Sequence, residues 1–195
     1  MDALTPSFLV GFGVIFVAEL GDKSQLMAMT FATRYRALPV LAGISIATAL
    51  IHAVSVGVGH GLGAALPTQW IALVAGVAFM GFAAWTLRGD SLSEAERART
   101  RRTSRSAVVA VTLAFLVAEL GDKTMLATIT LATQHAWFGT WAGSTAGMVV
   151  ADALAILVGQ QLARHLSERV IRYAAGGVFA VFGCWLLVEA IPRLT

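Results

Sequence analysis

Two short segments carry acidic and basic side chains inside otherwise apolar stretches. Both read Glu-Leu-Gly-Asp-Lys followed by a hydroxyl residue, and the second begins 100 residues after the first. Carboxylate and hydroxyl oxygens are the ligands that hard cations such as Mn²⁺, Ca²⁺ and Mg²⁺ prefer, whereas Zn²⁺ and Cu⁺ favour nitrogen or sulfur. The two segments therefore predict one cation site, with the ligands Glu19, Asp22, Ser24, Glu119, Asp122 and Thr124.

The charges within the two motifs do not cancel. Lys23 and Lys123 can neutralise only two of the four motif carboxylates. A divalent cation or two protons would balance the remaining two charges. A simpler interpretation pairs Glu19 with Lys23 and Glu119 with Lys123 one helical turn apart, only to hide charge and join helices. That interpretation leaves both aspartates without a partner.

Further polar residues in apolar surroundings have predicted supporting roles. Asp152 lies in the middle of an apolar segment, and His52 occupies the matching position 100 residues earlier. An acid inside a membrane is costly, so we expect Asp152 to bind a proton or to support the metal ligands. His52 could serve similarly or could pack as a neutral ring. Together with Lys23, Lys123 and Gln25, these two residues form the set predicted to balance charge or to bind the exchanged protons.

The segments that must position these residues are apolar and long. Hydrophobic residues make up 57% of the 195 residues and charged residues 13%, whereas a soluble domain carries about a quarter charged residues. The chain is therefore predicted to be an all-α integral membrane protein with six transmembrane helices. Their approximate ranges are 7–33, 38–62, 68–88, 107–133, 136–160 and 169–191.

Both motifs fall near the middle of a predicted span. Glu19 lies about 12 residues into its span, or about 18 Å along a core about 30 Å thick. In a continuous helix, Asp22, Lys23, Leu26, Thr30 and Thr33 would share one stripe with Glu19, and the second motif would repeat that stripe. Gly21 and Gly121 leave two alternatives open, because each could break its helix or could allow close helix packing. Gly143 and Gly147 are predicted to serve helix packing or a bent helix end.

The internal repeat divides the chain into two halves of three spans each. The predicted units are 1–88, an Arg-rich linker at 89–106, and 107–195. Because three is odd, the second half must enter the membrane from the opposite side, which is the inverted-repeat arrangement of many secondary transporters.

Arginines indicate the orientation, because cytoplasmic loops are enriched in Lys and Arg. One side of the predicted membrane carries Arg34, Arg36, Arg88, Arg97, Arg99, Arg101, Arg102, Arg105, Arg164, Arg169 and Arg172. The other side carries Arg193. The linker is thus expected in the cytoplasm and both termini outside, in a bacterial inner membrane. A nucleic-acid partner is not expected, since the basic residues lie between apolar spans.

The doubled E-x-G-D-K-[S/T] motif on two three-helix halves resembles the Golgi-type manganese/calcium transporter family, also grouped as the calcium:cation antiporter-2 family. The resemblance covers nearly the whole chain. It implies export of Mn²⁺, or of Ca²⁺, in exchange for protons, with Glu19, Asp22, Glu119 and Asp122 as metal-binding carboxylates. No permanently bound cofactor is implied, and a homodimer is compatible with the sequence.

Two other functions are compatible with acidic residues in a membrane. An exporter of small organic cations or amino acids would need an aromatic or larger polar pocket beside the acids. An intramembrane aspartyl protease resembles G-x-G-D, but Glu19 and Glu119 stand where its first glycine belongs. The zinc-protease string HExxH does not occur. A transporter, and no enzyme, is expected.

Overall fold

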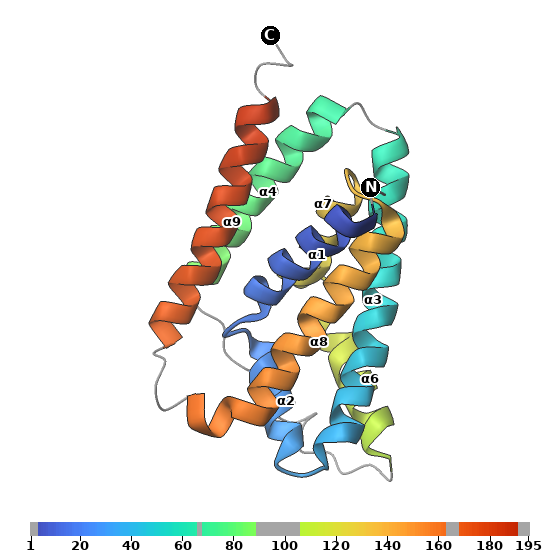
Figure 1. The fold of residues 1–195 in the computed structure, drawn as a ribbon, viewed down its shortest axis with the longest axis vertical. Coiled ribbons are helices and arrows are strands. Elements are labelled where there is room, and N and C mark those ends of the chain that lie inside the picture. Colours follow the sequence, from blue (N-terminus) through green and yellow to red (C-terminus); the bar gives the residue numbers. More distant parts are fainter. Residues whose placement is uncertain (1–3, 66–67, 89–105, 163–167, 191–195) are drawn as a thin grey trace.

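The computed structural model describes residues 4–65, 68–88, 106–162 and 168–190, and every regular element in these ranges is an α-helix (Figure 1). The first four helices are α1 (Leu4–Glu19), α2 (Lys23–Ala32), α3 (Ala37–Ala65) and α4 (Thr68–Arg88). The others are α6 (Ala107–Glu119), α7 (Lys123–Ala132), α8 (Trp137–Leu162) and α9 (Glu168–Ala190). The prediction of an all-α protein is confirmed for these ranges.

Four predicted spans coincide with single helices, namely α3, α4, α8 and α9. Among the described residues, Ala37–Ala65 and Trp137–Leu157 are each long and apolar enough to cross a membrane. The helices α1 and α2 together are also long and apolar enough, but they are bent by 76° at the break between them, so the pair is either a broken span or a re-entrant loop.

Each motif breaks its helix, so the predicted continuous polar stripe is wrong. Gly21 has φ +75° and Gly121 has φ +77°, a backbone conformation that costs residues with a Cβ about 1–2 kcal/mol. Asp22 and Asp122 follow in extended backbone as the N-cap residues of α2 and α7. A Cβ at Gly121 would meet nothing within 4 Å, so this glycine serves the break and not close packing.

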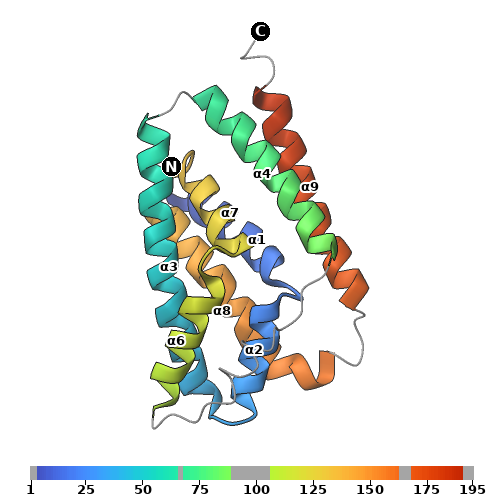
Figure 2. The same cartoon turned by 180° about the vertical axis from the view of Figure 1, so that it is seen from behind.

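Glycines bring helices from the two halves into close contact. α1 packs along α8, where a Cβ added to Gly143 would lie 2.2 Å from the carbonyl oxygen of Phe8. Gly147 similarly faces the backbone of α1, which confirms the packing role predicted for both glycines. Viewed from behind, α6 packs along α3 (Figure 2), with Gly43 facing Val108. Gly43 is 100 residues before Gly143, and Val108 is 100 residues after Phe8. The two contacts therefore occupy matching positions of the repeat.

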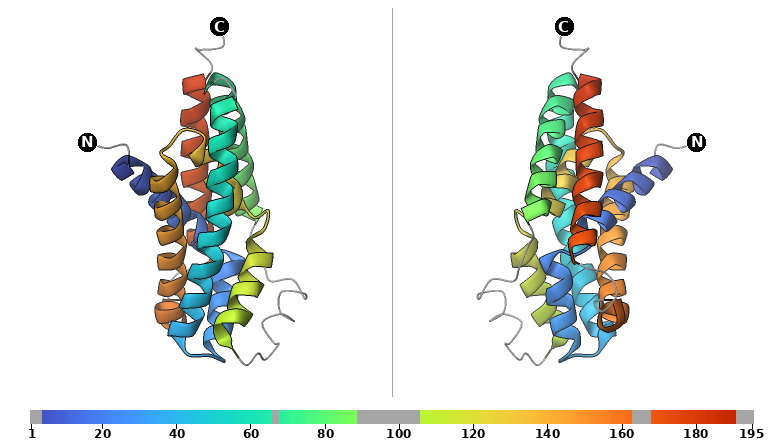
Figure 3. Two further views of the ribbon diagram at one scale, coloured as in Figure 1. Left: turned by 90° about the vertical axis from the view of Figure 1, so that its right-hand side faces the viewer. Right: turned by 90° about the vertical axis from the view of Figure 1, so that its left-hand side faces the viewer.

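The helices α4 and α9 form an antiparallel pair (Figure 3) that packs against α1 and α7. Four phenylalanines hold it, with ring centroids 5.3–5.8 Å apart, at positions that also differ by 100: Phe79, Phe82, Phe179 and Phe182. Large apolar side chains such as Leu38, Leu157 and Val181 are exposed on the outer surface. Such a surface suits contact with lipid.

Candidate metal site

The site forms where the two helix breaks meet in the interior. Glu19 ends α1 and Glu119 ends α6, while Asp22 and Asp122 precede α2 and α7. The six predicted metal ligands are all at most 2% exposed. One carboxylate oxygen each from Asp22, Glu119 and Asp122 lies within 4.8 Å of the other two. The structure thus brings three predicted ligands from both motifs into one cluster. Glu19 lies close enough to Asp22 and Glu119 of this cluster for their negative charges to repel one another.

Ion pairs connect the motifs crosswise. Lys23 Nζ lies 3.1 Å from Asp122 Oδ1, and Lys123 Nζ lies 2.8 Å from Asp22 Oδ1. The helix break explains this pairing, because it turns the lysine of each motif away from the line of the preceding helix. Each lysine therefore contacts an aspartate of the other half, whereas the simpler interpretation paired it with the glutamate of its own.

The hydroxyl residues hold the glutamates in place. Ser24 Oγ donates a hydrogen bond to Glu19 Oε1, and Thr124 Oγ1 donates one to Glu119 Oε2 at 2.9 Å. In both motifs the hydroxyl reaches back across the break by five residues. Each hydroxyl oxygen keeps lone pairs, so metal ligation by Ser24 and Thr124 stays a prediction.

Several carboxylate oxygens of the cluster lack a hydrogen bond. Among the described residues, the buried atoms Glu19 Oε2, Glu119 Oε1 and Asp122 Oδ2 accept none. A buried acceptor without a partner costs about 1–3 kcal/mol, and more when it is charged. A bound cation or proton would satisfy these oxygens, and their oxygen-only chemistry fits a hard cation.

Asp152 extends the acidic cluster from α8. It is fully buried, and neither carboxylate oxygen accepts a hydrogen bond from the described residues. When ionised, its carboxylate and those of Asp22 and Glu19 repel one another. His52 is also buried, and its Nδ1 lies 3.4 Å from Thr145 Oγ1 of α8, a contact that a neutral packed ring can make. The predicted proton-binding role of either residue stays a prediction.

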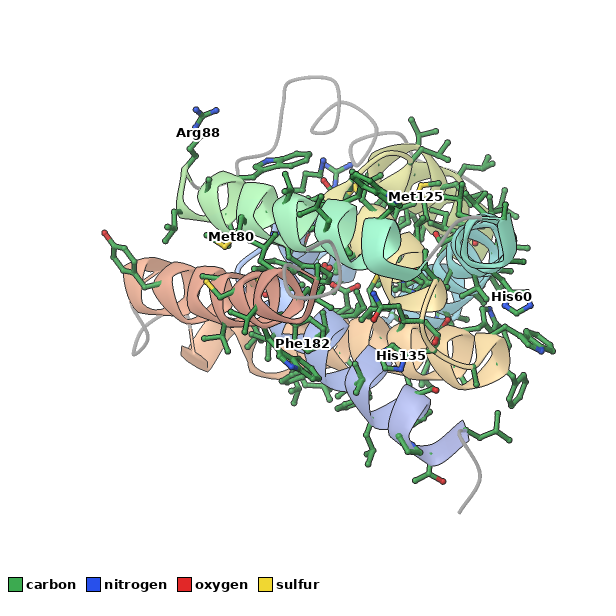
Figure 4. All side chains as sticks on the ribbon, turned by 90° about the horizontal axis from the view of Figure 1, so that it is seen from above. His60, Met80, Arg88, Met125, His135 and Phe182 are labelled. Atoms are coloured by element: carbon green, nitrogen blue, oxygen red, sulfur yellow. The ribbon has the colours of Figure 1, made fainter. Side chains whose placement is uncertain are left out.

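Gln25 and Met125 occupy matching positions of the two motifs but make different contacts. The sequence did not predict these contacts. Gln25 hydrogen-bonds both Gly21 and α8. Met125 on α7, labelled in Figure 4, places its sulfur 3.3 Å from the backbone nitrogen of Gly121. A position-by-position comparison of the two repeats contains the signal, since Gln25 and Met125 differ in chemistry while the neighbouring motif positions are identical or, at 24 and 124, both hydroxyl residues.

A hollow lies away from the acidic cluster, between the C-terminal end of α7 and the α4–α9 pair. Its lining consists of Phe79, Thr130, Leu131, Gln134, His135, Phe182, Trp185 and Leu186. His135 and Phe182 mark it in Figure 4. It contains none of the predicted ligands, which lie at the opposite end of α7.

Comparison with known sequences decides the family. The model of a family described as "Divalent cation/proton antiporter GDT1" matches residues 7–94 and 107–193, which leaves out most of the linker. The chain belongs to the GDT1 family. The resemblance inferred from the paired motifs is thereby confirmed, and this family consists of transporters.

Relatives within the GDT1 family come from bacteria and plants. A Vibrio cholerae protein named "Putative manganese exporter" is 34% identical over 87% of this chain and 84% of its own length. A GDT1-like protein of Synechocystis is 30% identical over 90% of this chain and 94% of its own length. The chain spans 59% of a chloroplastic GDT1-like protein of Oryza sativa, at 35% identity. No solved structure matches the chain.

Proposed function

We propose that this protein exports a divalent cation in exchange for protons, through a single site inside the membrane that both motifs build. Mn²⁺ is the first candidate substrate and Ca²⁺ the second. One observation carries the proposal: Asp22, Glu119 and Asp122, drawn from both motifs, place carboxylate oxygens within 4.8 Å of one another. Neither half could form this cluster alone.

The balance of charge explains why protons would accompany the metal. Five acids (Glu19, Asp22, Glu119, Asp122 and Asp152) face two lysines, so full ionisation leaves three uncompensated negative charges. A divalent cation compensates two of them. When the cation leaves, the charges would again be unbalanced in a low-dielectric interior, where unpaired ions are unstable. Protons that bind to the carboxylates at that moment restore the balance, and their release accompanies the next cation.

The size and chemistry of the cluster favour a metal ion as the substrate. Its three closest oxygens lie within 4.8 Å of one another, a spacing at which they could share one metal ion, whereas an organic cation would need an aromatic or larger polar pocket beside the acids. Oxygen ligands suit both Mn²⁺ and Ca²⁺. The name of the Vibrio cholerae relative supports Mn²⁺ as the first candidate.

The proposed architecture has six spans in two inverted halves, 1–88 and 107–195. Pairs of helices at matching positions support it, because α3 runs antiparallel to α8 and α4 runs antiparallel to α9. The contact of α1 with α8 is matched by that of α6 with α3. The start of α1 and the end of α9 lie toward one end of the molecule, and the starts of α3 and α6 toward the other (Figure 1, Figure 2). A two-fold axis in the membrane plane would produce each of these relations.

Glu19→Gln and Glu119→Gln test the shared site. Each substitution keeps the shape of the side chain and removes its charge, so we expect normal folding together with loss of metal transport. The measurement is Mn²⁺ and Ca²⁺ flux per folded protein in liposomes that contain a pH dye. Glu94→Gln, in the polar linker sequence, is the matched control and should transport like the wild type.

The two single variants also distinguish the proposal from simple charge hiding. If the acids only stabilise the fold, Glu19→Gln and Glu119→Gln should lower the yield of folded protein while leaving flux per folded molecule intact. A well-folded variant that moves both metals at the wild-type rate would show that the shared two-motif site is wrong.

A further inference from the structure

Gln25 connects the first helix break to α8. The backbone N–H of Gly21 donates to Gln25 Oε1 at 2.9 Å, and Gln25 Nε2 donates to the carbonyl oxygen of Ala151 at 3.1 Å. Ala151 directly precedes Asp152 on α8. One side-chain amide therefore ties the break that carries Asp22 and Ser24 to the helix that carries the fifth buried acid.

The second motif lacks this connection, because Met125 occupies the position of Gln25. The N–H of Gly121 points to Met125 Sδ at 3.3 Å. A thioether sulfur is a weak acceptor and has no hydrogen to donate, so Met125 cannot bond a carbonyl of the neighbouring helix as Gln25 does. Among the described residues, the side chain at position 125 therefore gives the second break one weak contact within its own turn and no hydrogen bond to α3.

The backbone carbonyl groups at the matching positions of α8 and α3 also differ in whether they are available to accept such a bond. Ile51 on α3 stands 100 residues before Ala151, and its carbonyl oxygen accepts a hydrogen bond from Ser55 Oγ at 2.8 Å. The position that matches Ser55 on α8 is Ala155, which has no hydroxyl. The carbonyl of Ala151 is therefore left to Gln25, while the carbonyl of Ile51 is occupied from within α3. Two sequence differences between the repeats, at positions 25/125 and 55/155, therefore act together: the first break is hydrogen-bonded to α8, and in the described residues the second break has no matching bond to α3.

We propose that Gln25 is a positioning residue that fixes the first break, and that the second break, at Gly121, is the one that moves while the cation binds and leaves. The inference rests on the proposed function. Fixing Gly21 to α8 holds Asp22 and Ser24 in a constant position relative to Asp152. The ligands of the second motif, Glu119 and Asp122, then change their distance from this fixed half of the site.

Residue-resolved hydrogen exchange of the whole, metal-free protein in nanodiscs tests the difference without a transport assay. The amide of Gly21 should exchange at least about tenfold more slowly than that of Gly121, because opening the first break also disrupts two hydrogen bonds. Gln25→Met, which copies the second motif, should remove this difference. Equal exchange of the two glycines in the wild type would overturn the proposal.

Flux kinetics in liposomes separate positioning from general stability. In Gln25→Met, a loosened ligand set should raise KM for Mn²⁺ about tenfold, the effect of about 1.4 kcal/mol. Met125→Gln combined with Ser55→Ala supplies the missing donor and frees the carbonyl of Ile51. If the second break must move, this double variant should lower the maximal rate about tenfold and change KM less than twofold.

Met29→Gln, one turn farther along α2, is the control for adding a glutamine to a motif helix and should keep the wild-type KM and rate. An unchanged KM in Gln25→Met, with the protein folded, would refute the positioning role. If the wild type moves no divalent cation, the proposed function fails, and the exchange rates of Gly21 and Gly121 still report whether the first break is held more firmly.

Discussion

At the scale of single residues, the two crosswise ion pairs differ in how fully the protein encloses them. Lys123 is 3% exposed and its partner Asp22 is fully buried, whereas Lys23 is 17% exposed. A buried charge that loses its partner cannot be rescued by water, and breaking a buried pair costs about 3–5 kcal/mol. The pair of Lys123 with Asp22 should therefore contribute more to stability than its counterpart.

Asp22→Asn and Asp122→Asn provide the test. Asp22→Asn should lower the free energy of unfolding by up to about 3–5 kcal/mol, because it breaks the more enclosed ion pair, and Asp122→Asn should cost less, because Lys23 is partly exposed. Denaturant unfolding in detergent measures both. Adding Lys123→Met to Asp22→Asn should restore part of the lost stability. Equal losses in the two single variants would contradict the difference.

The dependence of metal binding on pH follows from the same carboxylates. A carboxylate must be ionised to ligate a metal, so protons and the cation compete for the cluster. Affinity for Mn²⁺ should fall as the pH drops, by about tenfold per pH unit for each proton that the cation displaces. Titration of the purified protein between about pH 5 and 8 measures this slope. A flat profile would argue against exchange for protons, and Glu19→Gln should reduce the slope if Glu19 carries one of them.

At the scale of the helices, close contacts through glycine decide how the two halves join. α1 and α8 approach so closely at Gly143 that a methyl group there would lie 2.2 Å from the carbonyl oxygen of Phe8. At Gly57 on α3, the same methyl group would meet nothing within 4 Å. Gly143 therefore permits close helix contact, whereas Gly57 does not, although both lie within apolar helices.

Replacing each glycine with alanine measures the difference. Gly143→Ala should lower the free energy of unfolding by about 1–3 kcal/mol, because α1 must move away from α8. Gly57→Ala should raise it by about 0.5–1 kcal/mol, since alanine favours a helix and nothing opposes it. Thermal unfolding of the two variants in the same detergent compares them. A stable Gly143→Ala protein would show that this contact does not hold the halves together.

At the scale of the whole molecule, the arginine asymmetry predicts how the protein lies in the membrane. Ser93, in the linker sequence outside the described residues, is expected in the cytoplasm, and the C-terminal Thr195 is expected outside. Cys184 is exposed in the structure and must be replaced before either position is labelled. In a Cys184→Ala background, Thr195→Cys should react with a membrane-impermeant thiol reagent in intact cells, and Ser93→Cys should react only after lysis. The opposite pattern would reverse the orientation.

Several features of this protein follow from its sequence alone, because they depend on local properties of the chain. The length of each apolar run located α3, α4, α8 and α9 to within a few residues. The high cost of charge in a membrane marked Glu19 and Glu119 as interior residues. The repetition of one motif identified the family, which the comparison of sequences confirmed.

The tertiary structure decided how these parts meet. Glycine adopts positive φ about as readily as negative φ, so Gly21 alone could not reveal whether its helix breaks. That break ended the predicted polar stripe and turned each lysine toward the other half. Whether Lys123 lies beside Glu119 or Asp22 depends on the packing of two segments 100 residues apart, which no local pattern records. The bond of Gln25 to Ala151 arises for the same reason, since it joins atoms that only the folded chain brings together.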